Sequence, residues 1–174
     1  LAMLVGVWLP MGRLSVPAGA FVGALVSILL GVASMTVELL GYLALCSWMQ
    51  QFSPVAARIM LVCTVVMFVP GVVHHVFCGT VEWFYIRLGR TEEARQVILE
   101  FFKKTMSTML ACFVGFLVFS VVLLVMVAMG LTALPRWACL LNLLVLFAVM
   151  APFRIVGTLN IAGALMLAGL CILL

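Results

Sequence analysis

The chain has 174 residues, of which 68% are hydrophobic and only 8% are Asp, Glu, Lys or Arg. A soluble domain carries roughly a quarter charged residues, so this composition excludes an ordinary soluble protein and predicts an integral membrane protein. The net charge of +4 comes from a few basic residues beside apolar segments, which excludes a nucleic-acid-binding surface.

The apolar runs are long and show no alternation of apolar and polar residues, which indicates helices and not barrel strands. Helices pair every backbone group internally, as the membrane interior requires. The fold class we expect is therefore all-α: a polytopic transmembrane helix bundle of about six spans, forming a single domain over residues 1–174.

The first apolar segment, Leu1–Leu9, is shorter than a span, and we expect it to be the end of a truncated first helix. The second runs from Val16 to Trp48 and the third from Pro54 to Leu88. At 1.5 Å per residue these two helices are each roughly 50 Å long. Because that exceeds the ~30 Å hydrocarbon core, we expect them to tilt, to project into water, or to break, the candidate breaks being Gly31 and Pro70-Gly71.

The fourth segment begins with Thr91 as a helix cap and passes through an amphipathic stretch, Arg95–Lys104, into a span over Met106–Gly130. The fifth follows Pro135 and ends near Pro152, and the sixth covers residues 155–174.

The distribution of basic residues predicts the orientation. With the connection 87–104 on the cytoplasmic side, seven Lys or Arg residues face inward and two face outward, namely Arg58 and Arg136. This predicts a multi-pass protein of the inner or plasma membrane, with membrane lipid as a partner.

Ionisable residues inside spans are costly and usually functional. The densest set in this chain lies near the predicted cytoplasmic end, where we expect a pocket formed by His74, His75, Glu82, Arg154 and Asn160. Histidine and carboxylate together can transfer protons. The alternative is structural: histidines bonded to carbonyl groups, Glu82 reaching the interface, and Arg154 serving as a topological anchor. The spacing disfavours a metal site, and no cofactor motif is present.

Glu38 is a further ligand-binding candidate, on the second helix toward the outer face. Asn142 on the fifth segment lies at a similar height, so the two can meet. The distance along the helix separates Glu38 from the inner pocket unless the second helix is broken.

Gly19 and Gly23 form a G-x-x-x-G motif, which permits either close internal packing or a homodimer. The six cysteines are scattered singly and indicate small buried hydrophobic residues, with no C-x-x-C pair.

The segments Leu134–Asn142 and Pro152–Gly163, with His75 to Glu82 before them, resemble a family of small uncharacterised bacterial membrane proteins. That resemblance implies a multi-span topology. A looser similarity is to the emopamil-binding/sterol-isomerase type, which has His and Glu around a sterol pocket, although there a His precedes the acid by about one helical turn and here seven residues separate His75 from Glu82.

Two functions remain open at this point. The first is an intramembrane polar pocket that binds or transports a small lipophilic or anionic molecule. The second is an intramembrane enzyme that uses histidine and glutamate for isomerase-like proton transfer on a lipid-like substrate. A structural or accessory subunit is a third alternative.

Overall fold

The computed structural model describes residues 19–153 and 158–174, and within these ranges it contains helices and no strand. The expected all-α bundle is confirmed, while Leu1–Leu9 and Arg154 lie outside the described residues. The elements are α2 (Gly19–Met49), α3 (Pro54–Arg87), α4 (Glu92–Lys104), α5 (Met106–Ala128), η1 (Arg136–Leu141), α6 (Leu143–Met150), η2 (Ala151–Phe153) and α7 (Thr158–Leu173).

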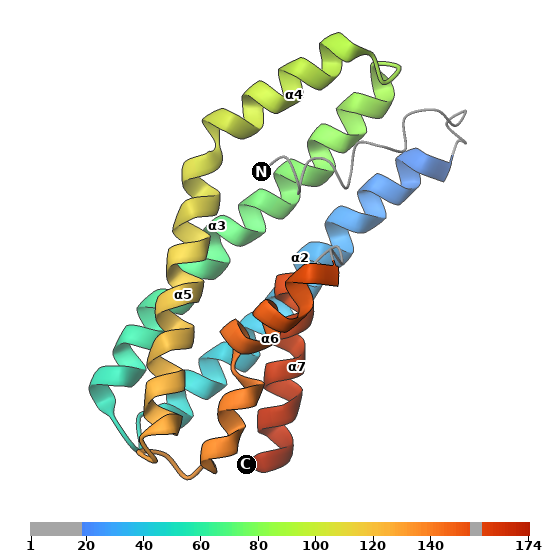
Figure 1. Ribbon diagram of the computed structural model, residues 1–174. Coiled ribbons are helices and arrows are strands. Elements are labelled where there is room, and N and C mark those ends of the chain that lie inside the picture. The colour runs from blue at the N-terminus through green and yellow to red at the C-terminus, as the bar shows by residue number, and fades with distance from the viewer. Residues whose placement is uncertain (1–18, 154–157) are drawn as a thin grey trace.

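The two longest helices, α2 and α3, form an antiparallel hairpin, and α5 runs back along α3 (Figure 1). The amphipathic α4 joins α3 to α5 at one end of the bundle. The shorter η1, α6 and α7 gather beside α2 and α5 toward the other end (Figure 1).

Capping residues set the starts of α3 and α4 as the sequence predicts. The Ser53 side chain accepts a hydrogen bond from Ala56 N, and Pro54 occupies the first turn, where its missing N–H costs nothing. Thr91 accepts from Ala94 N in the same way. Glu92 and Glu93 follow in the first turn of α4, where negative charge suits the helix dipole.

Neither overlong helix is broken at its candidate position. α2 continues through Gly31, and α3 continues through Pro70. The helices are instead continuous over 31 and 34 residues, which correspond to roughly 47 and 51 Å at 1.5 Å per residue, so tilting and projection into water remain as predictions. An internal proline such as Pro70 is tolerated in membrane helices where surrounding groups satisfy the freed backbone carbonyl.

The fifth segment is not a single helix. It forms η1 and α6, separated at Asn142, whose backbone is extended (φ −64°, ψ 139°). The Asn142 side chain accepts from Leu144 N and so starts a new helix inside an apolar run.

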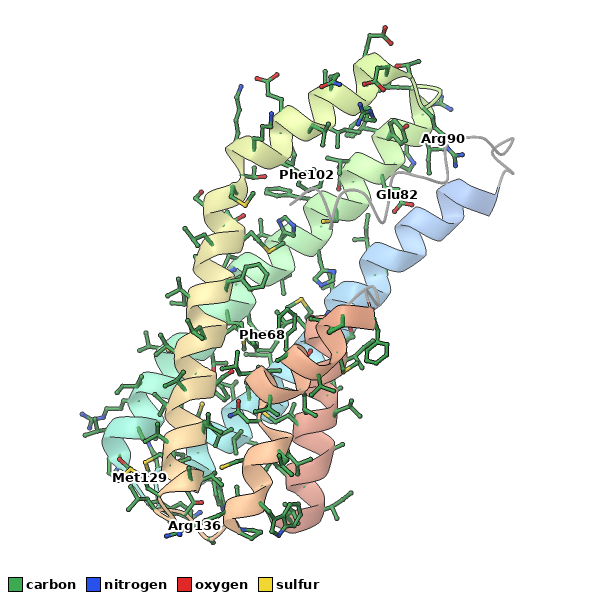
Figure 2. All side chains as sticks on the ribbon, viewed as in Figure 1. Phe68, Glu82, Arg90, Phe102, Met129 and Arg136 are labelled. Carbon is green, nitrogen blue, oxygen red and sulfur yellow. The ribbon has the colours of Figure 1, made fainter. Side chains whose placement is uncertain are left out.

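Close backbone approach joins α5 to α3. A Cβ atom on Gly115 would lie 2.8 Å from the Cys63 carbonyl oxygen and 3.0 Å from Met67 N, so only glycine fits there. Next to this contact Tyr42 is fully buried between Phe68 and Phe119, with ring centroids 5.0 and 4.9 Å away. These rings hold α2, α3 and α5 together in one core (Phe68 is labelled in Figure 2).

Among the described residues, three helices are long and apolar enough to cross a membrane: α2 from Gly31 to Met49, α3 and α5. The segments Leu143–Phe153 and Thr158–Leu173 are apolar but shorter. Large apolar side chains such as Leu29, Val37 and Val62 are exposed on the outside of the bundle, which is where a membrane protein meets lipid. The predicted side of the 87–104 connection stays a prediction, as does the homodimer through Gly19 and Gly23, whose packing lies outside what is described.

Candidate functional site

A polar contact joins α3 to α7. His75 Nε2 lies 3.2 Å from Asn160 Nδ2, and the imidazole ring lies against Gly31 of α2. A Cβ atom on Gly31 would be 3.1 Å from His75 Nδ1, so the glycine leaves room for the ring. Three helices therefore meet around one histidine.

A second close approach lies on the neighbouring turn of α7. The Glu38 carboxylate rests directly on Gly163, where a Cβ atom would collide with Glu38 Oε1 and lie 3.0 Å from the Tyr42 hydroxyl. Glu38 is half-buried, and Tyr42 is buried beside it. The absence of a side chain at Gly163 is what allows an acidic residue of α2 to face α7.

Asn160 and Gly163 share one face of α7 and differ by only about 4.5 Å in height. We call Glu38, Tyr42, His75 and Asn160 the polar layer because the two contacts lie at adjacent turns of this face of α7; on α2, Gly31 and Glu38 are about 10 Å apart. The sequence predicts separate regions for Glu38 and His75 unless α2 is broken. In the structure α2 is unbroken, and the two side chains contact α7 at positions one turn apart.

His74 points to a different part of the bundle. Its ring packs against Phe102 of α4, with centroids 5.8 Å apart, and its Nδ1 is buried with no hydrogen-bond partner among the described residues. The adjacent histidines therefore serve different interfaces, and only His75 belongs to the polar layer.

Glu82 lies two turns beyond His75 on α3, half-buried and close enough to Arg90 to interact electrostatically. Glu82 and Arg90 lie at the end of the bundle where α3 turns into α4 (Figure 2). Of the five residues expected to form the inner pocket, the structure brings His75 and Asn160 into contact, directs His74 toward α4 and places Glu82 beside Arg90.

Asn142 does not meet Glu38. Its amide donates to Ser120 O of α5 at 2.9 Å while its oxygen caps α6, so its hydrogen bonds hold α6 against α5. Its role is structural.

The described residues contain no group of three or more His, Cys, Asp or Glu side chains that could hold a metal ion. The polar layer can accept and donate hydrogen bonds and can exchange protons, since it combines a carboxyl, a phenol, an imidazole and an amide.

A hollow of about 720 Å³ lies outside the polar layer, between the C-terminal part of α3 and α4. No predicted site residue lines it. The amphipathic sequence of α4 could have indicated this hollow. Its apolar face needs a partner surface, and α3 covers that face only in part.

The polar face of α4 is tied by local ion pairs. Arg95 Nε lies 2.7 Å from Glu92 Oε2, and Lys104 Nζ lies 2.7 Å from Glu100 Oε1. Hydrogen bonds from Arg95 and Gln96 lower the pKa of Glu92 from 4.5 to about 2. The bond from Lys104 likewise lowers the pKa of Glu100.

Comparison with known proteins gives one match. Residues 21–171 match the model of a family of unknown function, DUF6796. No curated protein and no solved structure matches the chain. The matched region extends from α2 almost to the end of α7, and so includes the polar layer and the hollow between α3 and α4. The chain therefore belongs to this family of unknown function.

Proposed function

We propose that this membrane protein binds a small lipophilic molecule at the polar layer where α2, α3 and α7 meet. The observation that carries the proposal is the contact between His75 and Asn160, which joins α3 to α7 over Gly31. Polar side chains within spans are costly, and they persist where they bind one another or a ligand.

The layer has hydrogen-bonding capacity left for a ligand. A side-chain amide offers two N–H donors and an acceptor oxygen, and the contact with His75 uses only Nδ2 of Asn160. The Glu38 carboxyl lies one turn away on the α7 surface and adds an acceptor, or a donor when protonated. A lipophilic molecule with a hydroxyl, carbonyl or amine group fits this chemistry.

The carboxyl group of Glu38 favours a neutral or cationic ligand over an anionic one. Within residues 19–153 and 158–174, no basic side chain forms an ion pair with Glu38. An anion placed there would meet a carboxylate with no compensating charge in a medium of low dielectric constant.

Binding is favoured over transport by the helices themselves. Transporters commonly hold substrates at discontinuous helices near the membrane midplane, whereas α2 and α3 are continuous beside the polar layer. At the interruption beside Asn142, the Asn142 side chain bonds to Ser120 O and Leu144 N. These backbone groups are therefore not available to a substrate.

The test is to purify the protein from membranes, extract bound organic molecules and identify them by mass spectrometry. We expect the wild type to carry a lipophilic molecule that His75→Ala and Asn160→Ala both lose. His74→Ala is the matched control, because it removes the neighbouring imidazole from the α4 interface and should retain the molecule. A wild type with no bound molecule, or variants with unchanged content, would refute the site.

Proton transfer is the second candidate, favoured by the placement of Glu38 and His75 against adjacent turns of α7. An enzyme of this kind takes a proton from one carbon of the bound molecule and returns a proton to another. Incubation in heavy water should then introduce deuterium into the extracted molecule. Glu38→Gln should stop the exchange while retaining the molecule, and exchange that continues in this variant rules out the carboxyl as the proton carrier.

A further inference from the structure

We propose that the hollow between α3 and α4 binds an acyl chain of a phospholipid with an ethanolamine headgroup. The site is separate from the polar layer, and no residue of that layer lines it.

At the hollow, α3 and α4 pack against each other over only part of their facing surfaces. Near the junction with α5, Phe77 packs against Phe101 with ring centroids 5.2 Å apart, and His74 packs against Phe102. Toward the α3–α4 turn, Val81 and Phe84 of α3 and Leu88 just after it face Val97 and Ile98 of α4, but the described side chains leave a volume of about 720 Å³ unfilled.

The apolar lining indicates an apolar occupant. Water in such a space would lack the two to four polar partners that hold a buried water molecule. The lining side chains are also open to the surroundings, since Val97 is 66% exposed, Leu88 58% and Phe84 49%. An interfacial amphipathic helix buries such a face among acyl chains, so a lipid tail reaches the hollow without crossing water.

The charges at one end of the hollow indicate the headgroup. Thr91 and Glu93 line this end, next to Leu88. Glu93 takes no part in the two ion pairs of the described α4, which join Glu92 to Arg95 and Glu100 to Lys104. Its carboxylate can accept charge-assisted hydrogen bonds from a primary ammonium group.

The same end carries a basic residue that complements a phosphate. α3 ends at Arg87, which is exposed and directly precedes Leu88 of the lining. A zwitterionic headgroup at this end therefore has Glu93 available for its ammonium group and Arg87 for its phosphate. Ethanolamine is preferred to choline in this arrangement, because a quaternary ammonium group has no N–H to donate to Glu93.

The experiment is native mass spectrometry of the full chain released from micelles that contain equal amounts of phosphatidylethanolamine, phosphatidylcholine and phosphatidylglycerol. We expect the wild type to retain phosphatidylethanolamine roughly ten-fold over phosphatidylcholine, the effect of one charge-assisted hydrogen bond. Glu93→Gln should abolish this preference without removing lipid binding.

Val97→Trp places a large ring in the hollow from an exposed position and should eliminate lipid retention. Gln96→Trp adds the same ring on the exposed polar face of α4 and should leave retention unchanged. Equal retention of the three lipids by the wild type overturns the headgroup assignment. A wild type without retained lipid, or a Val97→Trp variant that retains it, overturns the site. Either result would mean that another part of the chain, or only transient lipid, covers the hollow.

Discussion

The side chains of His75 and Asn160 lie 3.2 Å apart although the residues are separated by 85 positions in the sequence. The contact fixes the height of α7 against α3, and Gly31 leaves room for the imidazole from the side of α2. Together with the approach of Glu38 to Gly163, it joins the C-terminal helix to the α2–α3 hairpin.

A double-mutant cycle measures this contact. Hydrogen bonds between membrane helices average about 0.6 kcal/mol and reach about 1.7 kcal/mol. We expect a coupling free energy in that range between His75→Ala and Asn160→Ala, measured by reversible unfolding in mixed micelles. The cycle of His74→Ala with Asn160→Ala is the control and should be additive. Additive behaviour in the first cycle as well contradicts the contact.

Gly163→Ala should destabilise the protein because its Cβ atom would displace the Glu38 carboxylate from the surface of α7. Overpacking of this kind costs about 1–3 kcal/mol. The loss should be recovered largely in the double variant Gly163→Ala with Glu38→Ala, which removes the colliding group. Gly169→Ala on the same helix is the control, since its Cβ atom would lie 2.9 Å from Leu141 Cδ1, a much smaller overlap than the collision with Glu38 Oε1 at Gly163. Equal losses at Gly163 and Gly169 would show that the carboxylate is not pressed on α7.

Asn142→Ala removes both a helix cap and a buried donor to Ser120 O. The lost cap alone costs about 1 kcal/mol, and the unpaired carbonyl adds to that cost. We expect a lower unfolding free energy, with faster hydrogen exchange confined first to α6. Ser34→Ala removes an exposed side-chain bond to Gly31 O and should change stability by less than about 0.5 kcal/mol. An unfolding free energy of Asn142→Ala equal to that of the wild type would contradict this structural role of Asn142.

The first turn of α4 should be sensitive to acid in a defined range. Because the folded pKa of Glu92 is about 2, against an ordinary value of 4.5, its contribution is present above pH 4.5 and is lost as the pH falls toward 2. Hydrogen exchange of residues 92–96, corrected for its intrinsic pH dependence, should therefore be constant from pH 7 to 5 and accelerate below 4.5.

Glu92→Gln should abolish that acid transition, whereas Glu100→Gln at the other end of the helix should leave it in place. A transition that is centred near pH 4.5, or that survives in Glu92→Gln, assigns it to another group.

The sequence predicts much of the fold because its boundaries are chemically marked. Ser53-Pro54 and Thr91 are capping signals, and the helices begin where these residues stand. The interruption at Asn142 was missed because hydropathy averages over one amide in an apolar run. The signal was there, since asparagine competes for backbone hydrogen bonds and favours helix caps over helix interiors.

The sequence predicts which polar residues lie in apolar helices, but not all of their contacts. His75 and Asn160 are expected near each other, and the structure places them in contact. The contact of Glu38 with α7 could not be predicted, because position along one helix does not reveal which neighbouring helix a side chain faces. Gly163 makes room for Glu38, and nothing in the sequence around a glycine shows which side chain packs on it.

The length of the α2–α3 hairpin has a consequence for the surrounding bilayer. Its helices of 31 and 34 residues rise roughly 47 and 51 Å, about 17 and 21 Å more than a ~30 Å hydrocarbon core. A helix longer than the core tilts or thickens the bilayer locally, at a cost of a fraction of a kcal/mol per ångström. Thicker membranes therefore accommodate this hairpin with less deformation than thin ones.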